Sequence, residues 1–234
     1  MQGYQSTSAG LTDKAALRRD YLQDILAPNR TAAMARIMAA FRKGCPVVEI
    51  YKDVFHGALY EIGHLWETNR ITVAQEHTAT AITQFIMANL YQHLSVSEGG
   101  RGRMVITGVQ GEFHQVGANM VADVLESDCW DVMFLGTNVP SKNVVRAVRE
   151  HRADLLGISV ALLSSIPALI GLVSLVRQEF GEGAPRILLG GGVLSLPGSD
   201  LLMQAPELAG CLLARNLDEA LELTRAISTG AGKP

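Results

Sequence analysis

Two glutamate–histidine pairs are the residues of this sequence whose types and spacing point to chemistry. Glu76 and His77 are adjacent in the stretch WETNRITVAQEH and follow Trp66 by ten and eleven residues. Glu112 precedes His114 by two residues in the stretch GEFHQVG. A carboxylate beside an imidazole can accept the proton of one ring nitrogen, which fixes the tautomer and makes the other nitrogen a better metal ligand. One histidine does not hold a bare ion, so the Glu112–His114 pair predicts a metal that arrives inside a cofactor.

The composition argues against several classes of protein. A chain of 234 residues can form one large domain or two ordinary ones, and a net charge of −3 gives no basic surface for nucleic acid. Cys45, Cys129 and Cys211 are scattered and form no CxxC, so we expect reduced thiols rather than disulfides or a zinc site. The N-terminus lacks the features of a signal peptide, and no apolar run is long enough to span a bilayer. The sequence therefore predicts a cytoplasmic protein.

The first part of the chain predicts an antiparallel four-helix bundle over residues 12–94. Short connections between amphipathic segments are typical of such bundles. Thr72 and Gln75 have the spacing of a capping box, which predicts the start of the last helix. The polar, glycine-rich stretch 95–103 predicts a linker. The four predicted helices are residues 12–27, 30–43, 46–66 and 72–94.

After the linker, short apolar runs alternate with helical patterns. Such a rhythm predicts strands buried on both faces in a doubly wound parallel sheet of the flavodoxin or Rossmann-like type, over residues 104–232. Ligands of these sheets bind beyond the carboxyl ends of the strands, at the point where the strand order reverses. His114 follows the first strand and is expected at that edge. The five predicted strands are residues 104–109, 130–136, 155–160, 186–191 and 210–214.

The residues at the predicted strand ends resemble the signature of the cobalamin-binding fold. That signature reads D/E-x-H-x-x-G, then S-x-L, then G-G. Glu112 stands for the commoner Asp and keeps its chemistry, whereas Ala161 replaces the Leu of S-x-L and weakens that part of the motif. The residues that carry the resemblance are Glu112, His114, Gly117, Ser159, Gly190 and Gly191.

The resemblance implies a cofactor and a role for each of these residues. His114 would replace the dimethylbenzimidazole of cobalamin as the lower axial ligand of cobalt, and Glu112 would orient its ring. The displaced nucleotide tail would contact Ser159, and Gly190 and Gly191 would let the tail pass close to the backbone. A helical bundle before the sheet is common in this family, so the resemblance covers the whole chain.

Trp66, Glu76 and His77 resemble the W-x9-E-H pattern in the helical cap of CarH-type cobalamin photoreceptors. In that family the indole fills space over the corrin beside the adenosyl group, and the Glu and His hydrogen-bond around that group. The resemblance implies adenosylcobalamin as the cofactor. Taken alone, these three residues are better explained as a Trp of the helical core and a Glu–His pair on a solvated helix face. The Glu112-x-His114 motif downstream shifts the interpretation to a role in cofactor binding. The family's His after the Trp, which ligates cobalt after illumination, is Glu67 here.

Three classes of function are compatible with a cobalamin, and the Trp66 trio favours the first. A sensor would use changes at the upper face of the corrin to move the bundle. A methyl carrier needs an upper face open to a methyl donor, and a mutase subunit needs a partner that holds substrate. The sequence shows no nucleophile–base pair, so we expect a protein that is not itself an enzyme.

The output of a sensor is expected to be a protein–protein contact. CarH-type proteins carry a DNA-binding domain before the bundle, and only about a dozen residues precede the first helix here. We therefore expect self-association, an effector enzyme, or a separate transcription regulator, as with AerR-type antirepressors. Some relatives are thought to hold a bilin as a second chromophore, and the sequence neither proves nor excludes one.

Overall fold

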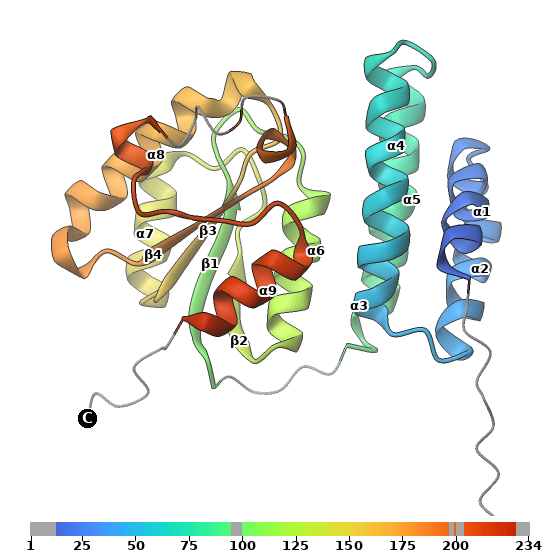
Figure 1. Cartoon of the computed structure of the whole chain (residues 1–234), viewed down its shortest axis with the longest axis horizontal. Helices are drawn as coiled ribbons and strands as arrows, with labels where there is room; N and C mark the ends of the chain where they lie inside the picture. The colour runs from blue at the N-terminus through green and yellow to red at the C-terminus, as the bar shows by residue number, and fades with distance from the viewer. Residues whose placement is uncertain (1–12, 95–99, 197–198, 200–203, 228–234) are drawn as a thin grey trace, which may run out of the picture. The chain divides into compact units, whose positions relative to one another are not determined.

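The chain divides into two compact units, Met1–Leu94 and Ser95–Pro234 (Figure 1). The structure, a computed structural model, describes residues 13–94, 100–196, 199 and 204–227. Residues 95–99 of the predicted linker lie outside this range. Each unit is described by itself below.

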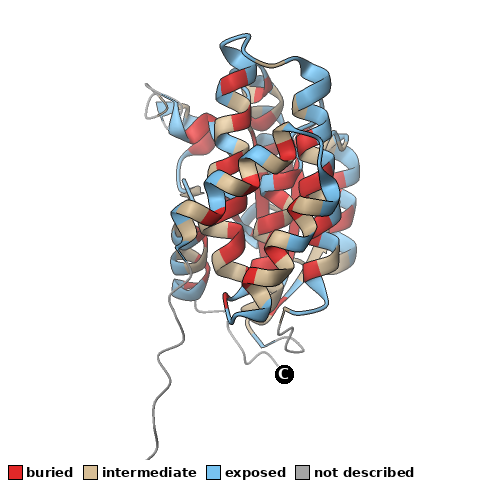
Figure 2. Cartoon of the chain, turned by 90° about the vertical axis from the view of Figure 1, so that its right-hand side faces the viewer, coloured by how far each residue is buried: buried red, intermediate tan, exposed pale blue. Residues whose placement is uncertain are grey.

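Residues 13–94 of the first unit form four helical segments, and the third of them is interrupted. Buried and exposed positions alternate around these helices (Figure 2), so each one turns an apolar side inward. The third segment was predicted without an interruption, but its middle is a wider π-helical turn that buries four of its six residues. The segments are α1 (Lys14–Leu26), α2 (Arg30–Arg42), the series α3 (Val47–Glu49), η1 (Ile50–Phe55) and α4 (His56–Glu67), and α5 (Val73–Tyr91).

Local sequence signals explain where these helices begin. The side chains of Asp13 and Asn29 each accept a hydrogen bond from a backbone amide in the first turn of α1 and α2. The predicted capping box is confirmed, because the Thr72 hydroxyl accepts from the Gln75 amide at 3.3 Å. The Gln75 side chain in turn accepts from the Thr72 amide at 2.9 Å. This box fixes the start of α5, three residues before Glu76.

The second unit is the predicted doubly wound parallel sheet. Its five strands are all parallel in the order β2-β1-β3-β4-β5. Helices α7 and α8 cover one face, and α6 and α9 cover the other. The elements are β1 (Gly102–Gly108), α6 (Val116–Ser127), β2 (Trp130–Phe134), α7 (Ser141–His151), β3 (Leu155–Ser159), α8 (Ile166–Phe180), β4 (Arg186–Gly190), β5 (Leu212–Leu213) and α9 (Leu217–Ala226).

Several predicted boundaries differ from the observed ones. The predicted linker overlaps β1 at residues 102 and 103, because Gly102 pairs with Trp130 and extends the strand. The last predicted strand, residues 210–214, shortens to Leu212–Leu213, since only these two residues pair with β4. The predicted end of the unit at 232 lies outside the described residues. In the described part of the chain, no helix has the length and apolar character needed to cross a membrane.

A buried hydrogen bond joins α1 to α5 and provides a test of the bundle. Tyr21 is fully buried, and its hydroxyl lies 2.8 Å from the Thr83 hydroxyl. Replacing Thr83 with Val should lower the free energy of unfolding by about 1–3 kcal/mol, because the Tyr21 hydroxyl loses this partner. Urea denaturation measures the change. Adding Tyr21→Phe to Thr83→Val should recover part of the loss, and a double variant no more stable than the single one would contradict this account.

Candidate functional site

The order in which strands are added to the sheet reverses at β1, whose two neighbours are β2 and β3. The helix after β1 lies on one face of the sheet and the helix after β3 lies on the other. The loops that leave the carboxyl ends of β1 and β3 therefore meet at the topological switch point, where parallel sheets bind ligands. Gly108 and Ser159, the last residues of these strands, are paired in the register. The predicted motif that contains His114 occupies the first of these loops.

The Glu112 carboxylate organises the loop after β1. Its side chain has no exposed surface, and its Oε1 accepts a hydrogen bond from His114 Nδ1 at 2.5 Å. The same oxygen accepts from the backbone amides of Phe113 and His114, each at 3.0 Å. The carboxylate thus holds both the backbone and the ring of His114, in the way expected from the two-residue spacing.

The second oxygen of Glu112 reaches the loop after β3. Its Oε2 accepts from the amides of Ala161 at 2.9 Å and Leu162 at 3.4 Å. It also accepts from the hydroxyl of Ser165, which is buried, at 3.2 Å. The sequence did not predict that the Ser165 hydroxyl and the Ala161 amide donate to Glu112. The adjacent serines at 164 and 165 were a weak signal, because such residues commonly cap helices.

These contacts decide the charge of Glu112. Burial by itself raises the pKa of a carboxyl group, but the hydrogen bonds from the His114 ring and from the amides of His114 and Ala161 lower the pKa of Glu112 to about 2. The carboxylate is therefore ionised at neutral pH and accepts the Nδ1 proton. This tautomer places a lone pair on Nε2. The His114 side chain is 48% exposed, so a ligand can reach its ring.

The edge of the sheet that carries His114 is unusually apolar. All the large apolar side chains that are exposed in the described part of the second unit lie in the loops after β1, β3 and β4. Such a concentration of exposed apolar groups marks a binding surface rather than a random scatter. These side chains are Phe113, Leu162, Leu163 and Leu196.

The predicted glycines differ in what the fold requires of them. Gly191 has a φ of +105°, and a Cβ there would lie 2.2 Å from the carbonyl oxygen of Val160, so only glycine fits. A Cβ on Gly190 would make an ordinary contact of 3.6 Å with the Ala214 carbonyl. A Cβ on Gly117 would meet nothing within 4 Å, so the chain itself leaves room there.

Trp66, Glu76 and His77 lie in the first unit, at one end of a helical hairpin. Trp66 is in the last turn of α4, and Glu76 and His77 are in the first turns of the adjacent α5 (Figure 1). Trp66 as a residue is 40% exposed, and the His77 side chain is 74% exposed. The Glu76 carboxylate accepts from the Thr80 hydroxyl at 2.9 Å and contacts His77 Nδ1. The second Glu–His pair is therefore also hydrogen-bonded.

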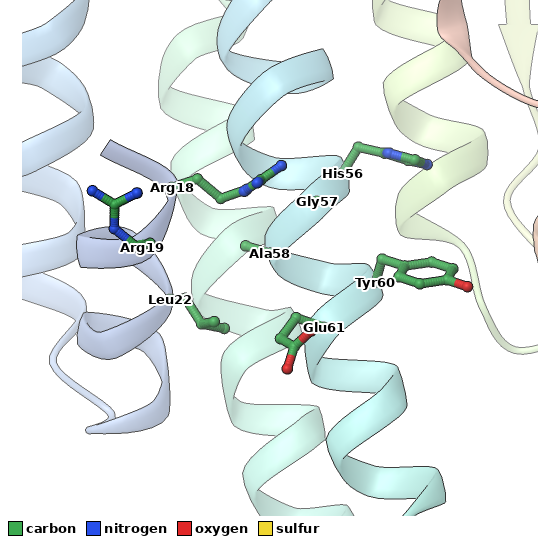
Figure 3. Close-up of a pocket in the computed structure, with 8 residues that line it drawn as sticks. All are labelled: Arg18, Arg19, Leu22, His56, Gly57, Ala58, Tyr60 and Glu61. Atoms are coloured by element: carbon green, nitrogen blue, oxygen red, sulfur yellow. The ribbon is translucent and has the colours of Figure 1, made fainter. Parts of the chain in front are cut away.

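A hollow of about 560 Å³ between α1 and α4 is separate from both groups (Figure 3). None of the predicted site residues lines it. Its charged groups include Arg18 and Arg19, which are exposed side chains of α1. His56 also lines the hollow, and desolvation lowers the pKa of its imidazole.

Comparison with protein families identifies the fold. The model of the B12 binding domain matches residues 102–220, and a second B12 binding domain model matches residues 17–91. The chain belongs to the B12-binding domain family. It is therefore a cobalamin-binding protein, and the two matched regions fall within the two units of the structure.

Individual relatives of this B12-binding protein include corrinoid proteins and a repressor. Dimethylamine corrinoid protein 1 of Methanosarcina mazei is 22% identical over 225 residues, which cover 94% of this chain and all of that protein. The HTH-type transcriptional repressor CarH of Myxococcus xanthus is 28% identical over 159 residues, 68% of this chain and 51% of CarH. The solved monomethylamine corrinoid protein of Methanosarcina barkeri shares the fold, with a TM-score of 0.77 at 20% identity over 90% of this chain and 97% of its own.

The ionised Glu112 predicts an acid-sensitive second unit. Since its folded pKa of about 2 lies below its ordinary value of 4.5, the stabilisation is present above pH 4.5 and is lost as the pH falls towards 2. Its size is on the order of 3 kcal/mol. Glu112→Gln should flatten the pH dependence of unfolding in this window. The measurement is urea denaturation followed by Trp130 fluorescence in a Trp66→Phe background, which leaves one tryptophan in the second unit. If the free energy of unfolding depended on pH in the same way with and without the Glu112→Gln substitution, the proposed hydrogen bonds to an ionised Glu112 would be contradicted.

Proposed function

We propose that His114 is the lower axial ligand of the cobalt in a bound cobalamin. The observation that carries the proposal is the fully buried Glu112 carboxylate 2.5 Å from Nδ1 of a half-exposed imidazole. That hydrogen bond leaves the lone pair of Nε2 as the donor to a metal and strengthens the imidazole as a ligand. Among the described residues, no group of three or more His, Cys, Asp or Glu side chains could hold an ion. A corrin supplies the cobalt and its remaining nitrogen ligands.

The surroundings of His114 fit a large, flat and largely apolar cofactor. The exposed side chains of Phe113, Leu162 and Leu163 suit contact with the edge and face of a macrocycle. The room beside Gly117 admits a ligand close to the backbone. We assign Ser159, Gly190 and Gly191 to the nucleotide tail, in keeping with the family signature, because Ser159 ends β3, Gly190 ends β4 and Gly191 begins the loop after β4.

We further propose that the chain is a regulatory protein that responds to light through adenosylcobalamin. Light breaks the cobalt–carbon bond of an alkylcobalamin, and a sensor must convert the loss of the adenosyl group into movement. The exposed Trp66 indole suits contact with a flat apolar surface, and the paired Glu76 and His77 offer polar partners to a ribose. The signal would leave through protein contacts, either self-association or a transcription regulator or effector.

The final cobalt ligand of this sensor should differ from that of the CarH type. Glu67 occupies the position after Trp66, and a carboxylate is a poorer ligand for this role than an imidazole. His77, with its side chain 74% exposed, is one replacement. The exposed His64 of α4 is another, and water is the third.

A corrinoid methyl carrier is the second candidate function. The match to a dimethylamine corrinoid protein along 94% of this chain and all of that protein supports it, since the alignment spans both units. A carrier needs an upper face that is open to a methyl donor and to a methyltransferase partner. In either role this chain would hold the cofactor, and the partner would supply the output or the catalysis.

Replacing His114 tests the lower ligand. His114→Ala should weaken binding of hydroxocobalamin by at least about tenfold, on the scale of losing one charge-assisted ligand interaction, and remove the imidazole-coordinated absorption spectrum. His151→Ala is the matched control, because His151 is the other histidine of the second unit and bonds the Asp131 carbonyl. An unchanged spectrum and affinity in His114→Ala would refute the assignment.

A competition between cofactors separates the sensor from the carrier. Adenosylcobalamin should bind more tightly than methylcobalamin, and Trp66→Ala should reduce the preference by roughly three- to tenfold, because the indole contact is lost. Equilibrium titration in the dark measures both affinities. Equal affinities, unaffected by Trp66→Ala, would favour the carrier.

Illumination of the adenosyl-loaded protein completes this test. The sensor predicts a change in hydrodynamic size or in partner binding, measured by size-exclusion chromatography before and after light. Repeating it with His64→Ala and His77→Ala identifies the final ligand from the absorption spectrum. Absorption bands beyond those of cobalamin in the protein purified from its source would reveal a bilin. No change in size or partner binding would remove light as the signal.

A further inference from the structure

The loop that carries His114 is held from both sides of β1. The carboxylate of Glu112 is held from the β3 side, by the Ala161 and Leu162 amides and Ser165. The backbone of the same loop is held from the β2 side, by residues 136–138. The second set of contacts is independent of the first, because it comes from the opposite neighbour of β1 in the sheet.

Gly136 and Thr137 hold the start of the loop. The Gly136 carbonyl accepts from the Gly108 amide at 2.9 Å and from the buried Thr107 hydroxyl at 3.2 Å. Thr137 lies over Gly108, where a Cβ would come within 2.6 Å of the threonine Cγ2. The end of β1 is thus in close contact with the loop after β2.

Asn138 holds the loop immediately before the motif. Its Oδ1 accepts from the Gly111 amide at 2.9 Å, and Gly111 directly precedes Glu112. Both residues have left-handed backbones, with φ of +57° for Asn138 and +86° for Gly111. Glycine tolerates this conformation, and asparagine tolerates it better than most other residues. Asn138 and Gly111 can therefore both adopt the backbone that this contact needs, in which the Asn138 side chain reaches the tight turn at Gly111.

We propose that Asn138 is a positioning residue for the metal-binding imidazole of His114. The inference rests on the proposed function and extends it to a residue of a different loop. Without the Asn138 acceptor, the Gly111 peptide would be free to reorient, and Glu112 and His114 follow it within three residues. A ligand atom must be held within a fraction of an ångström of its productive place, so a loose loop lowers metal affinity.

Two substitutions at Asn138 separate the acceptor from the backbone conformation. Asn138→Gly keeps the left-handed backbone and removes the side-chain acceptor. Asn138→Asp is the matched control, because aspartate tolerates the same backbone and still accepts from the Gly111 amide. The full chain is titrated with hydroxocobalamin. We expect binding about three- to tenfold weaker in Asn138→Gly, with a smaller imidazole-coordinated fraction in the absorption spectrum, and an affinity within about twofold of wild type in Asn138→Asp.

A measurement without cofactor distinguishes positioning from general stability. Nitrogen-15 NMR of the cofactor-free protein, recorded over a series of pH values, reports which ring nitrogens of His114 carry a proton. The wild type and Asn138→Asp should show the Nδ1-protonated form, and Asn138→Gly should show a mixture. A merely structural role would lower the urea midpoint and leave the tautomer and the bound spectrum unchanged, which would overturn the proposal.

The two proposals fail in different ways. If the wild type does not bind hydroxocobalamin, the proposed function is wrong, and the NMR comparison still decides whether Asn138 positions His114. If the wild type binds with imidazole coordination but Asn138→Gly matches it in affinity, spectrum and tautomer, only the role of Asn138 is wrong.

Discussion

The buried carboxylate of Glu112 is the constraint on which the candidate site depends. An ionised group without exposed surface is costly unless hydrogen-bond donors surround it, and six donors do so here. They come from two loops that are about fifty residues apart in sequence, so the charge can be buried only when both loops are in place. The order of the strands brings them together, since β1 and β3 are neighbours. The orientation of His114 thus follows from the hydrogen bonds that its ring and its amide donate to the buried Glu112 carboxylate.

The burial of the ionised Glu112 also explains why this site suits the binding of a cofactor better than catalysis by its own side chains. Glu112 uses its hydrogen-bonding capacity to hold the loops and the ring, and its pKa of about 2 makes it a poor proton donor or acceptor near neutral pH. His114 is left as a half-exposed imidazole in a loop that also exposes apolar side chains. Such an arrangement binds a group that brings its own chemistry.

The two units make separate contributions to the proposed function. In this proposal the sheet unit would supply the residues for the lower side of a corrin, and carriers and sensors would share these requirements. The helical unit carries Trp66, Glu76 and His77, and it is the upper side of the cofactor that differs between the two functions. Similarity to a corrinoid protein over the whole chain and to CarH over 68% of it is therefore compatible with either function. The choice between sensor and carrier depends on whether the upper face of the corrin accommodates an adenosyl group or is open to a methyl donor.

The sequence by itself determined the features that depend on short-range patterns. Alternating apolar runs and helical periods predicted the helical bundle and the parallel sheet, the Thr72–Gln75 spacing predicted a helix start, and Glu112-x-His114 predicted a hydrogen-bonded pair. Boundaries such as Gly102 were missed, because a strand extends only as far as its neighbour pairs with it. The hydrogen bonds of Ser165 and Asn138 were not predicted, because these residues lie 53 and 27 residues from their partners Glu112 and Gly111. Only the tertiary structure decides which loops meet, since the order of strands in the sheet, and not distance along the chain, brings their polar groups within hydrogen-bonding reach.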